Sequence, residues 1–80
     1  MSDMDRLQAS IGTWAEATFV DRPTIGIVVH MRREVEEISR ALWAGKSIPE
    51  EVADVLILCL NLADREGFSA REAVEAKMLK

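Results

Sequence analysis

The sequence predicts an all-α fold in which four helices form a bundle, and three features of the chain support this prediction. Apolar residues recur at three- and four-residue intervals, turn signals separate the periodic segments, and β-branched residues do not alternate with polar ones. The 80 residues contain no tyrosine and are 49% apolar and 30% charged, a composition typical of a globular chain. At this length, residues 1–80 are expected to form a single domain.

The first two helices are predicted from their apolar seams and from the residues that end them. The first spans about Asp3 to Thr18 and stops before Asp21-Arg22-Pro23, because the residue before a proline avoids helical dihedral angles. The second spans about Thr24 to Ala44 and stops at Gly45, a residue type common at helix ends. Its apolar residues follow three- and four-residue steps, which indicates one buried face.

The third and fourth helices each follow a sequence of the capping-box form. Ser47-Ile-Pro-Glu50 predicts a third helix that ends near Glu66, and Ser69-Ala-Arg-Glu72 predicts a fourth that runs to the end of the chain. The third helix is apolar on nearly every side, as expected of a helix that is buried all round. Three short helices would not cover it, so we expect a second copy of the chain to complete the bundle.

Charge and composition argue against several classes of function. Fourteen acidic residues against ten basic ones give a net charge of −4, which argues against a nucleic-acid polymer as the main partner. The longest apolar run, Val55 to Leu60, is too short to cross a membrane. Cys59 is the only cysteine and Met1 is not followed by a signal-peptide pattern, so a reducing, cytoplasmic location is expected.

Two pairs of acidic residues indicate a metal site. Glu34 and Glu37 lie three apart on the second predicted helix, and Glu51 and Asp54 lie three apart on the third, so each pair shares a helix face. Two antiparallel helices would aim the four carboxylates at one point, and oxygen ligands of this kind suit Mg²⁺ or Mn²⁺. Mg²⁺ commonly links a carboxylate to a substrate phosphate, which favours phosphate chemistry. The alternative is that these acids are ordinary solvated faces of helices.

Four further residues have both a structural and a functional interpretation. Asn61 lies on the same stripe as Asp54 and is expected either to contact sugar or phosphate or to satisfy a buried polar group. His30 precedes Glu34 by one turn and is either a packing residue or a hydrogen-bond donor behind the metal ligands. Phe19 is a candidate to stack on a nucleotide base, whereas core packing is favoured over base stacking for Trp14.

The acidic pairs and their surroundings resemble a known family. Glu34-Val-Glu-Glu37 followed by Glu51-Val-Ala-Asp54 is similar to the E-x-x-E and E-x-x-D signature of the MazG and all-α nucleoside triphosphate pyrophosphatases. The stretch from Asp54 to Ala63 resembles the helix that carries the second pair in that superfamily. Trp14-Ala-Glu-Ala-Thr-Phe19 and His30-Met-Arg-Arg-Glu34 resemble small phage-type dATP/dGTP pyrophosphohydrolases, and the similarity covers about residues 7–80.

This resemblance implies an activity and a set of site residues. Such proteins are all-α dimers or tetramers that bind Mg²⁺ and split a nucleoside triphosphate between its α and β phosphates, giving a monophosphate and pyrophosphate. The resemblance implies that Glu37 orients or deprotonates the attacking water. The metal ligands that it implies are Glu34, Glu37, Glu51 and Asp54.

The end of the chain leaves three outcomes open. Members of the family usually continue beyond the Lys77-Met-Leu-Lys80 stretch with an asparagine and a basic residue, whereas this sequence stops at Lys80. Either activity is reduced, or Lys77 and Lys80 hold the phosphates alone, or the sequence is a shortened form of a longer chain. The alternative function is therefore a helical dimerisation module that binds a protein partner and has lost catalysis.

Overall fold

The computed structural model describes residues 2–79, and within this range it contains four helices and no strand. They are α1 (Asp3–Thr18), α2 (Thr24–Trp43), α3 (Pro49–Glu66) and α4 (Ala70–Met78). The predicted all-α class is confirmed, and the helix ends lie close to their predicted positions.

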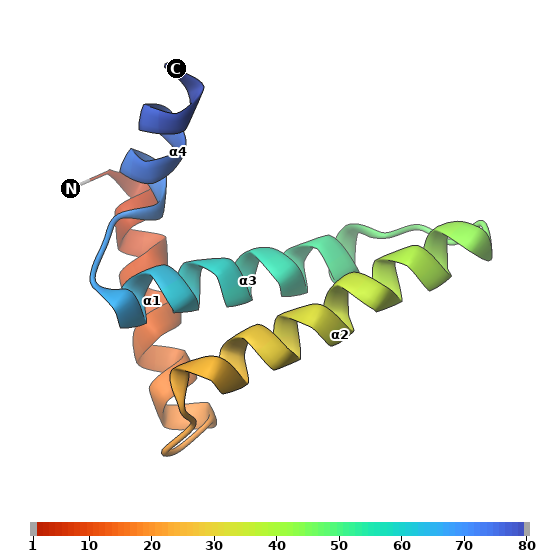
Figure 1. Ribbon diagram of the computed structural model, residues 1–80, viewed down its shortest axis with the longest axis horizontal. Helices are drawn as coiled ribbons and strands as arrows, with labels where there is room; N and C mark the ends of the chain where they lie inside the picture. The colour runs from red at the N-terminus through yellow and green to blue at the C-terminus, as the bar shows by residue number, and fades with distance from the viewer. Residues whose placement is uncertain (1, 80) are drawn as a thin grey trace.

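The helices form an open arrangement, and a single chain does not close into a compact bundle (Figure 1). Helices α2 and α3 form an antiparallel hairpin, and α1 packs across the C-terminal part of α3. Helix α4 begins beside the N-terminal end of α1 and extends beyond it. The radius of gyration is 13.7 Å, compared with about 12 Å expected for a compact chain of this length. Completion of the bundle by a second copy remains a prediction.

Close contact between α1 and α3 depends on Gly12. A Cβ atom at this position would overlap the carboxylate of Asp64 on α3, so any larger residue requires the Asp64 side chain to move. Ile11 and Ala15, on either side of Gly12, are buried in the small core. Gly12 weakens α1 as an isolated helix but permits its packing on α3.

Helix α4 is held to α1 by polar contacts at one end. The carboxylate of Asp5 accepts hydrogen bonds from Ser69 Oγ at 2.7 Å and from Arg71 Nε at 3.2 Å. Gln8 is buried, donates to the Phe68 carbonyl at 2.7 Å and accepts from the Ala70 N–H at 2.9 Å. These contacts fix the start of α4 beside the first turns of α1, away from the hairpin (Figure 1).

The caps of the helices agree only in part with the predicted capping boxes. Ser69 Oγ accepts from the Glu72 N–H at 3.2 Å, as predicted. The predicted box at Ser47 is wrong. Helix α3 begins at Pro49, so Ile48 and not Ser47 is its N-cap residue, and no side chain caps the helix. A complete box that sequence analysis missed joins Ser2 and Asp5 at the start of α1.

In the single chain α3 is covered only in part, and the predicted burial on every side by a second copy remains a prediction. Leu58, Leu60, Asn61 and Ala63 are buried, but Leu56 remains 56% exposed. The side of α3 that α1 and α2 leave uncovered is therefore apolar. None of the helices in residues 2–79 is both long and apolar enough to span a membrane.

Candidate active site

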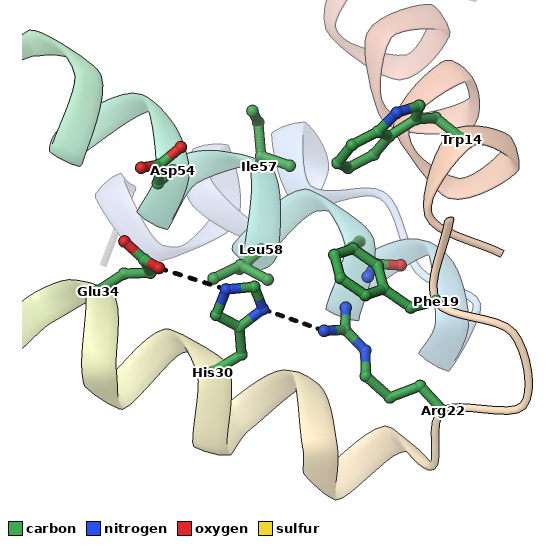
Figure 2. A pocket seen from close by; sticks show the side chains of 9 residues that line it. Trp14, Phe19, Arg22, His30, Glu34, Asp54, Ile57 and Leu58 are labelled. Atoms are coloured by element: carbon green, nitrogen blue, oxygen red, sulfur yellow. Dashed lines mark hydrogen bonds and ion pairs between the residues drawn. The ribbon is translucent and has the colours of Figure 1, made fainter. Parts of the chain in front are cut away.

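A cavity of about 130 Å³ lies where the end of α1 and the α1–α2 loop meet the α2–α3 hairpin. Figure 2 shows Glu34 and Asp54 at one side of it, Trp14 and Phe19 at the other, and His30 between them. The lining residues come from three helices and one loop: Trp14, Phe19, Arg22, His30, Glu34, Asp54, Ile57, Leu58 and Asn61. Small-molecule pockets usually measure about 300–1,000 Å³, so this cavity accommodates only part of a nucleotide in its present form.

The structure brings together six of the residues singled out from sequence and leaves the others outside. The six that line the cavity are Trp14, Phe19, His30, Glu34, Asp54 and Asn61. Glu37 is exposed one turn after Glu34, and Glu51 is half-buried one turn before Asp54. Lys77 lies on α4, which packs beside the N-terminal part of α1 and away from the cavity (Figure 1). Lys80 lies outside the described residues.

The position of Glu34 disfavours ionisation of its carboxyl group. Its side chain is only 15% exposed. Burial raises the pKa of the Glu34 carboxyl above its ordinary value, and the neighbouring charges of Glu37 and Asp54 raise this pKa further. Acidic groups from α2 and α3 therefore act on one another across the hairpin.

The acids approach one another without forming a closed set of ligands. Within residues 2–79, no three side chains of His, Cys, Asp or Glu converge closely enough to hold a metal ion. Glu37 and Asp54 are exposed. Closing the set therefore requires changes in side-chain rotamer or a residue from another chain.

His30 packs against Phe19 and also contacts Glu34. Its ring lies 5.8 Å from the Phe19 ring in an edge arrangement, Nε2 lies 3.3 Å from Glu34 Oε1 and Nδ1 lies 3.0 Å from Arg22 Nη1. A guanidinium can only donate, so Nδ1 accepts, and the neutral ring carries its proton on Nε2. His30 therefore packs against Phe19 and turns its Nε2 atom toward Glu34. Its predicted role behind metal ligands remains a prediction.

Arg22 is the site residue that sequence analysis missed. The segment Asp21-Arg22-Pro23 was interpreted only as a helix break, yet the guanidinium lines the cavity and lies 3.9 Å from the centre of the Phe19 ring. The signal in the sequence was weak: a single arginine in a short loop between two segments that carry site residues.

Trp14 and Asn61 both line the cavity but differ in how far they are exposed to solvent. Trp14 is 51% exposed and packs edge-on to Phe19 at 5.9 Å, so the core-packing interpretation favoured for Trp14 is wrong for the single chain. Asn61 is only 2% exposed and lines the cavity. An aromatic pair and a buried amide together offer a stacking surface and a hydrogen-bonding group to a base or sugar.

The comparisons agree with the class that the fold and the acidic hairpin indicate, the all-α nucleotide pyrophosphohydrolases. Residues 7–80 match the dATP/dGTP pyrophosphohydrolase family, and the chain belongs to this family. The resemblance seen in the sequence is therefore confirmed.

Two curated relatives are similar to the chain over nearly its whole length. It is 39% identical over 72 residues to a dATP/dGTP diphosphohydrolase of Cyanophage S-2L, covering 90% of this chain and 67% of the relative. It is 33% identical over 72 residues to a dATP/dGTP diphosphohydrolase of Salmonella phage PMBT28, covering 90% of this chain but only 24% of that relative. No solved structure shows a significant match.

Proposed function

We propose that this chain hydrolyses dATP and dGTP to the nucleoside monophosphate and pyrophosphate, using Mg²⁺, with Mn²⁺ as an alternative ion. The observation that carries the proposal is the position of Glu34 and Asp54, which come from different helices, line one cavity and belong to an E-x-x-E and E-x-x-D pattern. Membership of the dATP/dGTP pyrophosphohydrolase family supports the choice of substrate.

The residues around the cavity fit a divalent cation. Glu34 is largely buried beside two other carboxylates, and a buried acid in this position needs a counter-charge in order to ionise. Carboxylate oxygens are the ligands that Mg²⁺ and Mn²⁺ prefer. Glu34, Glu37, Glu51 and Asp54 would hold the ion. When bound, it supplies polarisation of the α-phosphoryl group and neutralises developing charge.

The side chains of this protein supply orientation and proton transfer. Glu37, exposed and one turn from Glu34, accepts a proton from the attacking water, whose oxygen forms a new bond to the α phosphorus. The bond from the α phosphorus to the bridging oxygen breaks, and its electron pair leaves with pyrophosphate. His30, whose Nε2 lies 3.3 Å from Glu34 Oε1, would orient that carboxylate.

The base would lie against the aromatic residues of the cavity. Trp14 and Phe19 offer aromatic surface to a purine, and the buried amide of Asn61 offers a hydrogen bond to base or sugar. Lys77 would reach the phosphates only in an assembly that brings α4 of another copy to the cavity.

We also propose that the active form is a homodimer or homotetramer in the cytoplasm, where deoxynucleotides are available. Several large apolar side chains of the α2–α3 hairpin are exposed in the single chain: Val35, Leu42, Trp43, Val52 and Leu56. Exposed apolar surface of this kind favours association. Light scattering that finds a stable, folded monomer at micromolar concentration would contradict this part of the proposal.

Product analysis tests the proposed reaction. The protein is incubated with each common dNTP and Mg²⁺, and phosphorus NMR identifies the products. We expect pyrophosphate and monophosphate from dATP and dGTP, and loss of activity in Glu37→Gln. Glu36→Gln is the matched control, because exposed Glu36 contacts Arg40 on α2. Release of orthophosphate, or activity that survives Glu37→Gln, would contradict the proposal.

A further inference from the structure

One edge of the Arg22 guanidinium is buried without a hydrogen-bond partner. Nη1 contacts His30 Nδ1 at 3.0 Å, but Nε and Nη2 are shielded from solvent and have no partner among residues 2–79. Buried donors without partners are rare, because each loses its hydrogen bonds to water. This pair therefore calls for an acceptor that binds there.

The charge of Arg22 also lacks a paired carboxylate. Within residues 2–79 no acidic oxygen lies within ion-pair distance of its guanidinium. Its one side-chain hydrogen-bond partner in this range is His30 Nδ1, which carries no negative charge. Burial lowers the pKa of Arg22, and the nearby charge of Arg65 lowers it further. Arg65 is already paired, to Glu16 at 2.8 Å. The charge of Glu16 partly offsets these effects on the Arg22 pKa, but its carboxylate is paired with Arg65, so no anion contacts Arg22 directly.

The fold holds Arg22 in place through several contacts. Arg65 Nη1 donates to the Arg22 carbonyl at 2.7 Å and so anchors the loop to α3. Gly26 leaves room for the side chain, since a Cβ atom there would lie 2.9 Å from Arg22 Cγ. The Phe19 ring lies over the guanidinium at 3.9 Å. The unpaired edge is thus built into the site and is not a mobile surface side chain.

We propose that the Nε and Nη2 edge of Arg22 binds two oxygens of a phosphate group of the nucleotide. These two N–H groups form the side fork of a guanidinium, which matches the spacing of two oxygens on one phosphate. Arg22 lines the same cavity as Glu34 and Asp54 (Figure 2), so one triphosphate chain can meet the acidic side and the arginine. The assignment to a nucleotide rests on the proposed function, whereas the anion site itself does not.

Entry of a phosphate requires a covering side chain to move. Both nitrogens are closed to solvent, and Phe19 lies against the guanidinium at the start of the same loop. Phe19 is half-buried and also packs edge-on against Trp14 and His30. A smaller side chain at Phe19 is expected to open this edge.

Pyrophosphate binding tests the proposal without requiring hydrolysis. The affinity of the full chain for inorganic pyrophosphate with Mg²⁺ is measured by calorimetry for wild type, Arg22→Met and Arg22→Lys. Arg32→Met is the matched control, because Arg32 is exposed on α2 and outside the cavity. We expect Arg22→Met to weaken binding about ten- to a hundredfold and Arg22→Lys to recover only part of the loss, since lysine keeps the charge but not the paired donors.

Two additional readouts separate binding from a structural role. In buffer without anions, Arg22→Met is expected to melt at the same temperature as wild type or higher, because it removes a buried unpaired charge. The Nε–H signal of Arg22 in nitrogen-15 NMR is expected to shift when pyrophosphate is added to wild type. Failure of pyrophosphate to bind wild type, equal affinity of Arg22→Met and wild type, or an Nε–H signal that does not respond would overturn the proposal. Arginine-dependent pyrophosphate binding without dATP hydrolysis would instead refute only the proposed function.

Discussion

The Nε2 atom of His30 lies 3.3 Å from Oε1 of Glu34, one helical turn further along α2. On its other side, the His30 ring accepts from Arg22, so a loop arginine sets the tautomer of the histidine that contacts the acid. The α1–α2 loop is therefore linked through His30 to the half-buried carboxylate of Glu34.

Replacing His30 by alanine should weaken metal binding. The variant loses the ring that contacts Glu34 at 3.3 Å, and loss of a partner that orients a ligand typically reduces metal affinity about ten- to a hundredfold. Calorimetric titration with Mn²⁺ measures the effect, with Ser39→Ala as a control at an exposed position of α2. Equal affinity of His30→Ala and wild type would show that His30 is only a packing residue.

Replacing Glu34 by glutamine should change how stability depends on pH in the absence of metal. Folding raises the pKa of Glu34, so the folded state keeps a proton that the unfolded chain has released. The free energy of unfolding of wild type therefore falls as the pH rises from about 4, the ordinary glutamate value, through the raised pKa. Glu34→Gln does not lose stability in this way, because glutamine does not ionise.

Thermal melts in EDTA compare Glu34→Gln with wild type and with Glu36→Gln across this pH range. The gap between Glu34→Gln and wild type should widen in favour of the variant as the pH rises, while Glu36→Gln follows wild type. A gap that stays constant would contradict the environment assigned to Glu34.

Removing the Asp5 carboxylate should release α4 from α1. Asp5→Ala loses the acceptor for Ser69 and Arg71 and half of the Ser2 capping box. Hydrogen exchange should accelerate in α4 and much less in the α2–α3 hairpin. Asp3→Ala is the matched control, because Asp3 contacts only the neighbouring Arg6 among the described side chains.

The Asp5 contacts should also persist in mild acid. Hydrogen bonds from Ser69 and Ser2 hold the pKa of Asp5 well below its ordinary value. The stabilisation is therefore present above the ordinary aspartate pKa and is lost only as the pH falls through the lowered one. Release of α4 at the ordinary pKa of aspartate would show that these contacts do not form in solution.

Replacing Gly12 by alanine should destabilise the fold, although alanine is the better helix former. The added methyl group collides with Asp64, and overpacking of this kind costs about 1–3 kcal/mol. Denaturant unfolding measures the change. Adding Asp64→Ala to Gly12→Ala should recover part of the loss, and a Gly12→Ala variant more stable than wild type would contradict the close crossing of α1 and α3.

Most of the fold followed from local signals in the sequence. The ends of α1 and α2 were predictable because Pro23 restricts the residue before it, whereas Gly45 readily adopts the positive φ of 69° found after α2. The position of Ser47 was misread because the capping pattern fits more than one starting residue, and the helix begins at Pro49. Gly12 lies against Asp64, which is distant in sequence. Local helix propensity therefore showed that Gly12 weakens α1 but not that it makes room for α3.

The candidate site was predictable where helical spacing determines it. Glu34 and His30 share a face of α2 because they are four residues apart. The role of Arg22 was not predictable, because it depends on how the loop folds back over His30 and Phe19. Exposure of Trp14 was also unpredictable, since an apolar seam does not reveal that the single chain leaves part of it uncovered.

Mn²⁺ binding followed by electron paramagnetic resonance tests most directly whether the paired acids of α2 and α3 hold a shared ion. Wild type and Glu36→Gln should deplete the free-ion signal equally, whereas Glu37→Gln and Asp54→Asn should each lose most of the binding. Retention of wild-type binding in both Glu37→Gln and Asp54→Asn, or an equal loss in Glu36→Gln, would contradict the account.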